Sequence, residues 1–519
     1  MVTTKAKRAK SDFPANPKPA DAEKDMARTM HTATVPRLSI RMYRHGLGDC
    51  LLLRFARSGK ATFNVLIDCG IITVAQDAKT TMTNVVNDIR TTCGRLDVVV
   101  MTHEHWDHAS GFSKQHAQTL FDEIEIGEVW YGWSEDPQNE LGQQLRRERS
   151  EKVTALTNAV VALSKNAANP LAALRAQGIS NILGFFGMDP AALGANGKGI
   201  GKTRDAFEYL MKRPGVKTRF CYPDKNPIPL GDVDNVRVFV MGPPQNEGLI
   251  KKSAPSKTGR EVYEMAAESG LAANLGAAFA RLSATEPLDT SNTSDCPFDE
   301  GLRRGGPGRQ QRTRAGLSEL LQGTWDNPDE EWRRIDLDWT QVSETLALNL
   351  DSHTNNTCLV LAFEFIDTGQ VFLFPADAQV GNWLSWQALK WKVRNGNGNG
   401  TVDITGQDLL SRTVFYKVGH HGSHNATLRS LGLEQMASDD LVAFIPVFKE
   451  QAMKNRWTSM PFQPLVERLK EKTSGRLLQS DQPQPVAGDL PLLSDAARGQ
   501  FLSAIHVGPN DLYFEYQIH

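Results

Sequence analysis

Apolar residues along the chain follow two patterns that predict strands. Polar and apolar side chains alternate in Arg37–Tyr43, which is typical of a strand with one buried face. Val98–Met101 is a continuous apolar run, as expected for a strand buried on both faces. Similar runs predict further strands at Cys50–Phe55, Phe63–Ile67, Phe220 to about Met241, Leu346–Leu350, Leu359–Phe365, Gln370–Phe374, Val414–Val418, Leu441–Ile445 and Asp511–Gln517.

Apolar residues at helical spacing lie mainly between these strands. They predict helices within 80–93, 145–215, 258–283, 380–393 and Pro464–Lys472. The stretch 284–316 is polar and glycine-rich and is expected to be a loop. Because the helical stretches interrupt a β-rich frame, we expect a large, mainly helical insertion at about 115–345. Residues 1–35 are basic with little apolar periodicity, which predicts a disordered tail before a single interrupted domain at 36–519.

Composition narrows the class of protein. The 519 residues carry a formal net charge of −2, so no overall basic field indicates a nucleic-acid coat or a membrane-surface protein. The longest apolar stretches, such as Val98–Met101 and Cys358–Phe363, are far shorter than the ~18 residues that a membrane span needs. No apolar run follows the basic N-terminus, and the 6 cysteines contain no Cys-x-x-Cys pair. We therefore expect a cytoplasmic protein with reduced thiols and no membrane association.

Histidines gather in two short windows, 103–108 and 420–424. The first has the pattern His103-x-His105-x-Asp107-His108 and follows directly after a predicted buried strand. Side chains two residues apart can point the same way, so His103 and His105 can share one metal ion while Asp107 and His108 face a second. Imidazoles together with a carboxylate suit Zn²⁺, Mn²⁺ or Fe²⁺. The pattern therefore predicts a metal site.

Two other strand ends carry residues of the same kind. Asp377 follows the strand predicted at Gln370–Phe374, and a single carboxylate there can bridge two cations. His420 and His421 follow the strand at Val414–Val418. Because adjacent histidines do not easily serve the same metal ion, we expect one to be a ligand and the other to contact substrate or support the ligands. Ser423 could donate to a phosphate oxygen or cap a helix.

These segments together resemble the metallo-β-lactamase superfamily, in which motifs equivalent to Ile67–Gly70, His103–His108, Asp377 and His420-His421 occur in the same order. Three further segments are similar to the metallo-β-lactamase domain of ComEC-type competence proteins. They are Gly46-Leu47-Gly48-Asp49-Cys50, Asn355-Asn356-Thr357-Cys358-Leu359-Val360-Leu361 and Lys417-Val418-Gly419-His420-His421-Gly422-Ser423. The resemblance covers roughly 37–113, 236–244 and 345–480. It implies the superfamily's αββα sandwich, with metal ions at one edge of two facing sheets.

The resemblance also implies a set of site residues and two divalent metal ions, Zn²⁺ or Mn²⁺. The superfamily's isolated third-motif histidine has no obvious counterpart, and His353 is the candidate for it. Asp68 is expected to support the ligand loop from behind. The expected ligands are His103, His105, Asp107, His108, Asp377, His420 or His421, and His353. The expected groups around the substrate are Asp107, His421, Ser423, Asn355 and Asn356.

The activity that this resemblance implies is phosphodiester hydrolysis by a hydroxide activated between the two metal ions, with nucleic acid as substrate. Arg303–Arg314, in the predicted loop, could contact backbone phosphates or be merely solvated. Two alternatives stay open: a hydrolase of a small phosphodiester or other ester, and a non-enzymatic partner protein with a structural metal site. A deep pocket would favour a small substrate, and an open basic groove would favour nucleic acid.

Overall fold

The computed structural model describes residues 35–519, apart from 74, 165–169, 189–201, 253–338, 395–399, 426, 456 and 458. The predicted tail up to residue 34, the helix predicted at 258–283 and the loop predicted at 284–316 lie outside the described residues. Within the described part of the chain, no helix is both long and apolar enough to cross a lipid bilayer.

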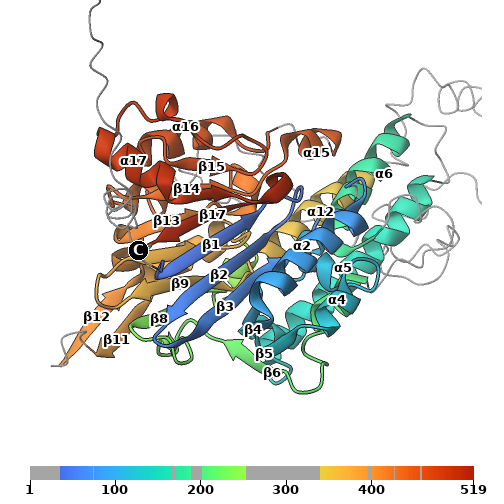
Figure 1. Cartoon of the computed structure of the whole chain (residues 1–519). Helices are drawn as coiled ribbons and strands as arrows, with labels where there is room; N and C mark the ends of the chain where they lie inside the picture. Colours follow the sequence, from blue (N-terminus) through green and yellow to red (C-terminus); the bar gives the residue numbers. More distant parts are fainter. Residues whose placement is uncertain are drawn as a thin grey trace, which may run out of the picture.

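One large sheet has eight strands and is drawn mainly in blue and cyan in Figure 1. Its order is β16 (Ile505–Val507), β17 (Tyr513–Ile518), β1 (Leu38–Tyr43), β2 (Cys50–Arg57), β3 (Lys60–Cys69), β4 (Arg95–Met101), β5 (Glu125–Gly132) and β6 (Lys217–Cys221). Strands β16 to β3 pair antiparallel, whereas β3 to β6 pair parallel.

The second large sheet has seven strands. Its order is β15 (Leu477–Gln479), β14 (Val442–Ile445), β13 (Thr413–Lys417), β10 (Val371–Phe374), β9 (Val360–Phe365), β8 (Val236–Gly242) and β7 (Ile228–Pro229). Strands β15, β14, β13 and β10 pair parallel, and the pairs from β10 to β7 are antiparallel. A separate hairpin joins β11 (Lys390–Arg394) to β12 (Thr401–Thr405).

The two large sheets pack face to face. Val98 and Val100 of β4 share one apolar cluster with Phe363 of β9, while the next residue along β4, Val99, belongs to a different cluster. This alternation buries both faces of β4, as the continuous apolar run predicts. Helix α2 (Ala78–Cys93) covers the outer face of the first sheet, where its Ile89 joins the cluster of Val99.

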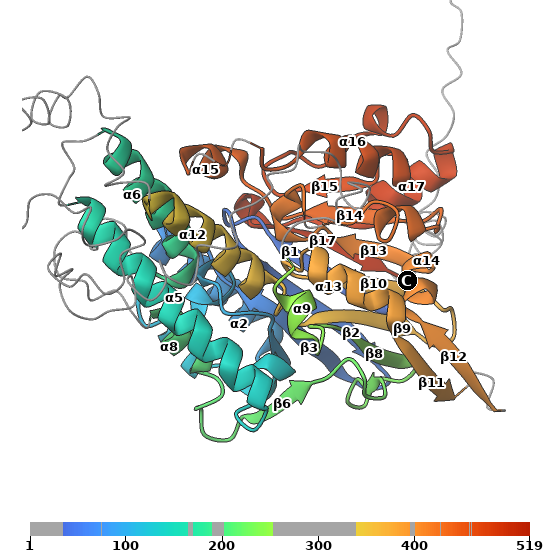
Figure 2. The same cartoon turned by 180° about the vertical axis from the view of Figure 1, so that it is seen from behind.

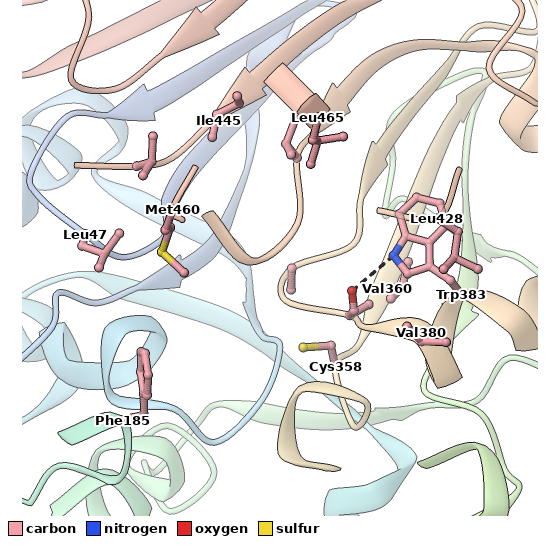
Figure 3. Close-up of a cluster of buried hydrophobic side chains, with 14 of the residues drawn as sticks. Leu47, Phe185, Cys358, Val360, Val380, Trp383, Leu428, Ile445, Met460 and Leu465 are labelled. Atoms are coloured by element: carbon pink, nitrogen blue, oxygen red, sulfur yellow. Dashed lines mark hydrogen bonds between the residues drawn. The ribbon is translucent and has the colours of Figure 1, made fainter. Parts of the chain in front are cut away.

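Helices also cover the outer face of the second sheet, where α13 (Val380–Ser385) contacts β8, and a further group of helices lies beside the two sheets (Figure 1 and Figure 2). Figure 2 shows α5 (Glu140–Ser164), α6 (Pro170–Leu183) and α12 (Trp339–Asn355) side by side. The apolar cluster there reaches from these helices to α13, and Figure 3 shows Trp383 of α13 donating from Nε1 to the carbonyl oxygen of Ala378. The remaining α-helices of the described residues are α3 (Trp106–Ala109), α4 (Gln118–Asp122), α8 (Lys202–Glu208), α9 (Glu247–Ile250), α14 (Gly406–Ser411), α15 (Lys449–Lys454), α16 (Gln463–Lys472) and α17 (Asp495–Ser503).

The prediction of a mixed α/β protein is confirmed, but two element assignments are wrong. Leu346–Leu350 is part of helix α12, where Leu346, Ala347 and Leu350 are buried and Leu348 is exposed. That spacing is helical, and the apolar run is too short to separate a helix from a strand. The helix expected at 380–393 ends early, because 390–394 forms strand β11.

The stretch between residues 115 and 345 contains two kinds of element. Strands β5 to β8 lie in this range. β5 and β6 belong to the eight-stranded sheet, and β7 and β8 belong to the seven-stranded sheet. Helices α5 and α6 come between β5 and β6 and pack with α12. The described part of the expected insertion is therefore divided between sheet strands and a group of helices.

Candidate metal centre

The residues with metal-binding side chains meet where strands of both sheets end. The segment His103–His108 connects β4 to α3, and Asp68 is near the end of β3. From the second sheet, Asp377 follows β10, and His420 and His421 form a tight turn after β13. Parallel strands present their carboxyl ends at one edge, so residues far apart in the sequence converge there.

Backbone conformation at this edge is unusual. Asp68, Ala376, His420 and His421 all have left-handed backbones, with φ of 53°, 51°, 41° and 52°. Such values are uncommon for residues other than glycine and concentrate at functional sites. A Cβ on Gly70 would lie 2.4 Å from the carbonyl carbon of Asp107, so only glycine lets this turn press against the ligand loop.

Four side-chain atoms form a compact group: Oδ2 of Asp107, Nε2 of His108, Oδ2 of Asp377 and Nε2 of His421. The distance from Asp107 to His421 is 3.0 Å and that from His108 to Asp377 is 3.1 Å. The cross distances, from His108 to Asp107 and from His421 to Asp377, are 3.8 and 3.7 Å. Four ligands at 2.0–2.1 Å around a tetrahedral zinc ion stand about 3.4 Å apart. This group, the metal quartet, could therefore hold a divalent cation.

Hydrogen bonds fix the orientation of both histidines of the metal quartet. His108 donates from Nδ1 to Asp68, 2.8 Å away, and Asp68 also accepts from the backbone N–H of Thr102. His421 donates from Nδ1 to the carbonyl oxygen of Pro446 at 2.7 Å. Each bond leaves Nε2 facing the quartet. A partner on the second ring nitrogen is what metal-bound histidines usually have.

His103 and His105 lie beside the metal quartet. Nε2 of His103 is 3.0 Å from Nδ1 of His105, and Oγ1 of Thr102 is 3.1 Å from Nδ1 of His103. The ring of His105 stacks on Phe185 and meets Phe186 edge-on. Burial and the neighbouring histidines lower the pKa of His103 well below its usual value, which keeps this imidazole neutral as a ligand must be.

The structure gives the two adjacent histidines different surroundings. His421 joins the metal quartet, while Nδ1 of His420 is 2.7 Å from Oγ of Ser423. The backbone N–H of His420 donates to Oδ1 of Asp377, 3.0 Å away. His420 and Ser423 thus form a pair at the rim of the quartet.

The centre carries an excess of buried negative charge. Asp49, Asp68, Asp107 and Asp377 are all almost inaccessible, and Lys417 is the single Lys or Arg that pairs with any of them in the described part of the chain. Although burial opposes it, the carboxylates of Asp377, Asp107, Asp49 and Asp68 raise the pKa of His108 well above its usual value. The pKa of His421 is raised in the same way. Bound cations would take over this neutralising role.

The expected third-motif residue does not reach the quartet. Nδ1 of His353, near the end of α12, is 3.4 Å from Nζ of Lys152. Burial and the charges of Lys152 and Lys251 lower the pKa of His353 to about 3. The structure therefore places the predicted ligand His353 among lysines, which repel a cation.

Asn355, the last residue of α12, and Asn356, just after it, differ in their contacts. Asn356 donates from Nδ2 to the carbonyl oxygens of Ile250 and Lys252, and its Oδ1 accepts from the backbone N–H of Asn382. Its side chain thus connects the segments around Ile250 and Asn382. Asn355 donates to Oδ2 of Asp351 at 3.2 Å, while its own Oδ1 is buried without a hydrogen-bond partner among the described residues.

Sequence reasoning assigned no role to three residues at the centre. Asp49 and Lys417 form a buried ion pair, and Nζ of Lys417 also donates to the carbonyl oxygen of Ala376 at 3.0 Å. Asp49 lies in the Gly46–Cys50 motif and Lys417 in the Lys417–Ser423 motif, so the family resemblance could have indicated both. Asp351 lies with Oδ1 4.0 Å from Nε2 of His105. Burial together with Asp377 and Asp107 raises its pKa to about 8, and its only sequence signal is its spacing from Asn355.

A cavity of about 530 Å³ lies beside the ligand loop. Glu104, between His103 and His105 in the sequence, and Phe186, which contacts His105, both line it. The rest of the lining includes Arg146, Arg147 and Arg149 of α5, and Thr203 and Arg204 of α8. Arg204 pairs with Glu104 at 2.8 Å, and Arg149 also pairs with Glu104. The arginine-lined cavity is thus connected directly to the metal-ligand loop.

Comparison with known proteins gives no family assignment: no family model matches the chain, and no curated protein is significantly similar to it. The functional conclusion therefore rests on the residues of this centre.

Proposed function

We propose that this protein is a metal-dependent hydrolase of the metallo-β-lactamase type that cleaves phosphodiesters. The observation that carries the proposal is the metal quartet, in which two carboxylate oxygens and two oriented imidazole nitrogens lie within 4.8 Å of one another. Two facing sheets with helices on both outer faces agree with the αββα sandwich that the sequence motifs imply. Divalent cations, when bound here, would lower the pKa of a water molecule and polarise the phosphate.

The residues of the chain would bind the cation, orient its ligands and contact the phosphate. Asp107, His108, Asp377 and His421 would hold a cation, and Asp68 would keep His108 in orientation through its bond to Nδ1. Lys417, bonded to Asp49 and to the carbonyl oxygen of Ala376, would fix the turn that carries Asp377. Ser423, held against His420 at the rim, would donate its hydroxyl to a phosphate oxygen.

The arginine-lined cavity supports a phosphate-bearing substrate over other esters. Four arginines and one glutamate line it. Arg149 and Arg204 pair with Glu104 and Glu135, and the positive charge next to the ligand loop therefore comes mainly from Arg146 and Arg147. Arginine presents a planar fork of donors that matches phosphate oxygens. Nucleic acid would meet these arginines with its backbone phosphates.

A hydrolase of a small phosphodiester is the second candidate, and the size of the cavity favours it. A volume of about 530 Å³ falls in the range of roughly 300–1,000 Å³ that holds small ligands. The same arginines would then bind the phosphate of a nucleotide-sized molecule.

Hydrolysis of three substrates would test the proposal: plasmid DNA, a short oligonucleotide and bis-(p-nitrophenyl) phosphate, each with Mn²⁺, with Zn²⁺ and with a chelator. Asp107→Asn and His421→Ala should abolish the metal-dependent reaction, whereas His506→Ala, at an exposed position on β16, should keep it. Cleavage of the nucleic acids indicates a nuclease, and cleavage of the small ester alone indicates the second candidate. No hydrolysis of any substrate by a metal-loaded protein would contradict both.

A further inference from the structure

Helix α12 brings a carboxylate, not the expected histidine, to the metal centre. Successive residues of an α-helix are about 100° apart around its axis, so residues two positions apart point to nearly opposite sides. His353 contacts Lys152, on the side of α12 that faces α5. Asp351 points the other way, toward His105. The same turn of helix thus offers an oxygen ligand in place of a nitrogen ligand.

One carboxylate oxygen of Asp351 accepts a hydrogen bond, and the other faces the metal centre without one. Its Oδ2 accepts from Nδ2 of Asn355, one helical turn later, at 3.2 Å. Its Oδ1 and Nε2 of His105 are both buried and lack a hydrogen-bond partner among the described residues. A buried polar atom without a partner is costly, so two of them facing each other need an explanation.

The separation of these two atoms points to a cation. They are 4.0 Å apart, which is too far for a hydrogen bond but within the span of two metal–ligand bonds of about 2.0–2.2 Å each. A cation at this place would satisfy both atoms. His103 lies at the other nitrogen of this ring: its Nε2 is 3.0 Å from Nδ1 of His105, which orients the ring and leaves Nε2 of His105 to the cation.

We propose that Asp351 is a metal ligand and that, with His105, it forms a second cation position next to the metal quartet. The inference rests on the proposed metal-dependent function and names a ligand for it. Substitution of carboxylate for imidazole changes the character of the position, because oxygen ligands suit Mn²⁺ and imidazoles suit Zn²⁺. The second position therefore favours Mn²⁺ more strongly than a position built of histidines alone would.

Metal content and affinity of the full-length protein test the inference without any assay of activity. Metal-free protein would be titrated with Mn²⁺ and with Zn²⁺ by calorimetry, and the bound ions counted by elemental analysis. The unmodified protein should bind two ions. Asp351→Asn should keep one tight ion and weaken the second by about tenfold or more. His353→Asn, the matched variant two residues away, should bind two ions as before.

Two further variants complete the test. Asp351→His should restore the second ion and shift its preference toward Zn²⁺. Asp351→Ala should behave like Asp351→Asn, and thermal melting of the metal-free variants would show that each is folded. Two ions bound by Asp351→Asn with unchanged affinity would overturn the assignment. Fewer than two ions in the unmodified protein would instead contradict the two-metal centre on which the inference rests.

Discussion

At the scale of single residues, the hydrogen bond made by Nδ1 of His108 and of His421 determines where Nε2 of the same ring points. Asp68 accepts from Nδ1 of His108 and from Thr102, and so aims Nε2 of His108 at the metal quartet. Asp68→Asn should lower metal affinity by about 10- to 100-fold, because an amide can present a donor where a carboxylate only accepts. Asp403→Asn, an exposed position on β12, is the control. Equal affinities in calorimetric titrations of the two variants would contradict this role.

Proton release should accompany metal binding. The nearby carboxylates raise the pKa of His108 and His421, which favours the protonated form of both imidazoles in the metal-free protein. A metal ion binds only the deprotonated nitrogen, so affinity should increase as pH rises toward these pKa values. Calorimetric titrations in two buffers with different ionisation enthalpies should give different apparent heats. Identical heats would show that no proton is released.

Residue pattern and the family resemblance pointed to the residues that converge in the metal quartet, but not to every residue around it. Four ligand-type side chains within six residues after a buried strand are specific enough to indicate His103–His108. On α12 the choice of His353 followed residue type, whereas the helical phase turns Asp351 to the site. The ion pair between Asp49 and Lys417 depends on contacts between distant strands, which a local pattern does not contain.

At the scale of elements, glycines allow the turns after β1 and β3 to pack on the ligand loop. Asp49 donates its backbone N–H to the carbonyl oxygen of Asp107 at 3.0 Å, and Gly70 donates to Asp49. In Gly70→Ala the new Cβ would lie 2.4 Å from the backbone of Asp107, so we expect a loss of about 1–3 kcal/mol in unfolding free energy and weaker metal binding. Gly499→Ala, in open space on α17, is the control. Denaturant unfolding measures both.

Element prediction worked where the apolar pattern was unambiguous. The continuous run at Val98–Met101 lies within β4, and the helix predicted at Pro464–Lys472 matches α16. The prediction was wrong at Leu346–Leu350 because five mostly apolar residues fit a strand or a buried helix equally well. Which strands become neighbours is set by long-range packing, so the order of the sheets could not be predicted from local spacing.

At the scale of the whole molecule, the metal centre connects the two large sheets. Asp107 and His108 follow a strand of the first sheet, and Asp377 and His421 follow strands of the second. Because cations bound there would neutralise carboxylates from both sheets, chelation should lower the melting temperature by several degrees. Melting curves with Mn²⁺ and with chelator would measure this. The difference should disappear in Asp107→Asn, and its persistence there would place the stabilising metal elsewhere.

The helices beside the sheets are expected to set substrate binding without setting metal binding. Arg147 is exposed on α5 and lines the arginine-lined cavity, and it is not part of the ion pairs around Glu104. Arg147→Ala should therefore leave the number of bound metal ions unchanged. It should raise KM for a phosphodiester substrate by roughly fivefold, which corresponds to about 1 kcal/mol for an exposed charge contact. The turnover number should change little, because this contact is made before and during the reaction alike.

Two measurements separate the effect of Arg147 on KM from the effect of the overall charge of the molecule: KM at varied ionic strength, and KM of a variant that lacks a different exposed arginine. KM should rise with ionic strength, and less steeply in Arg147→Ala, since one charge contact has been removed. Arg394→Ala removes the same charge from β11, where Arg394 is exposed in the separate hairpin, and should leave KM unchanged. An equal rise of KM in both variants would mean that the overall charge of the molecule, not this cavity, attracts the substrate. A fall in turnover without a change in KM would instead assign Arg147 to the chemical step.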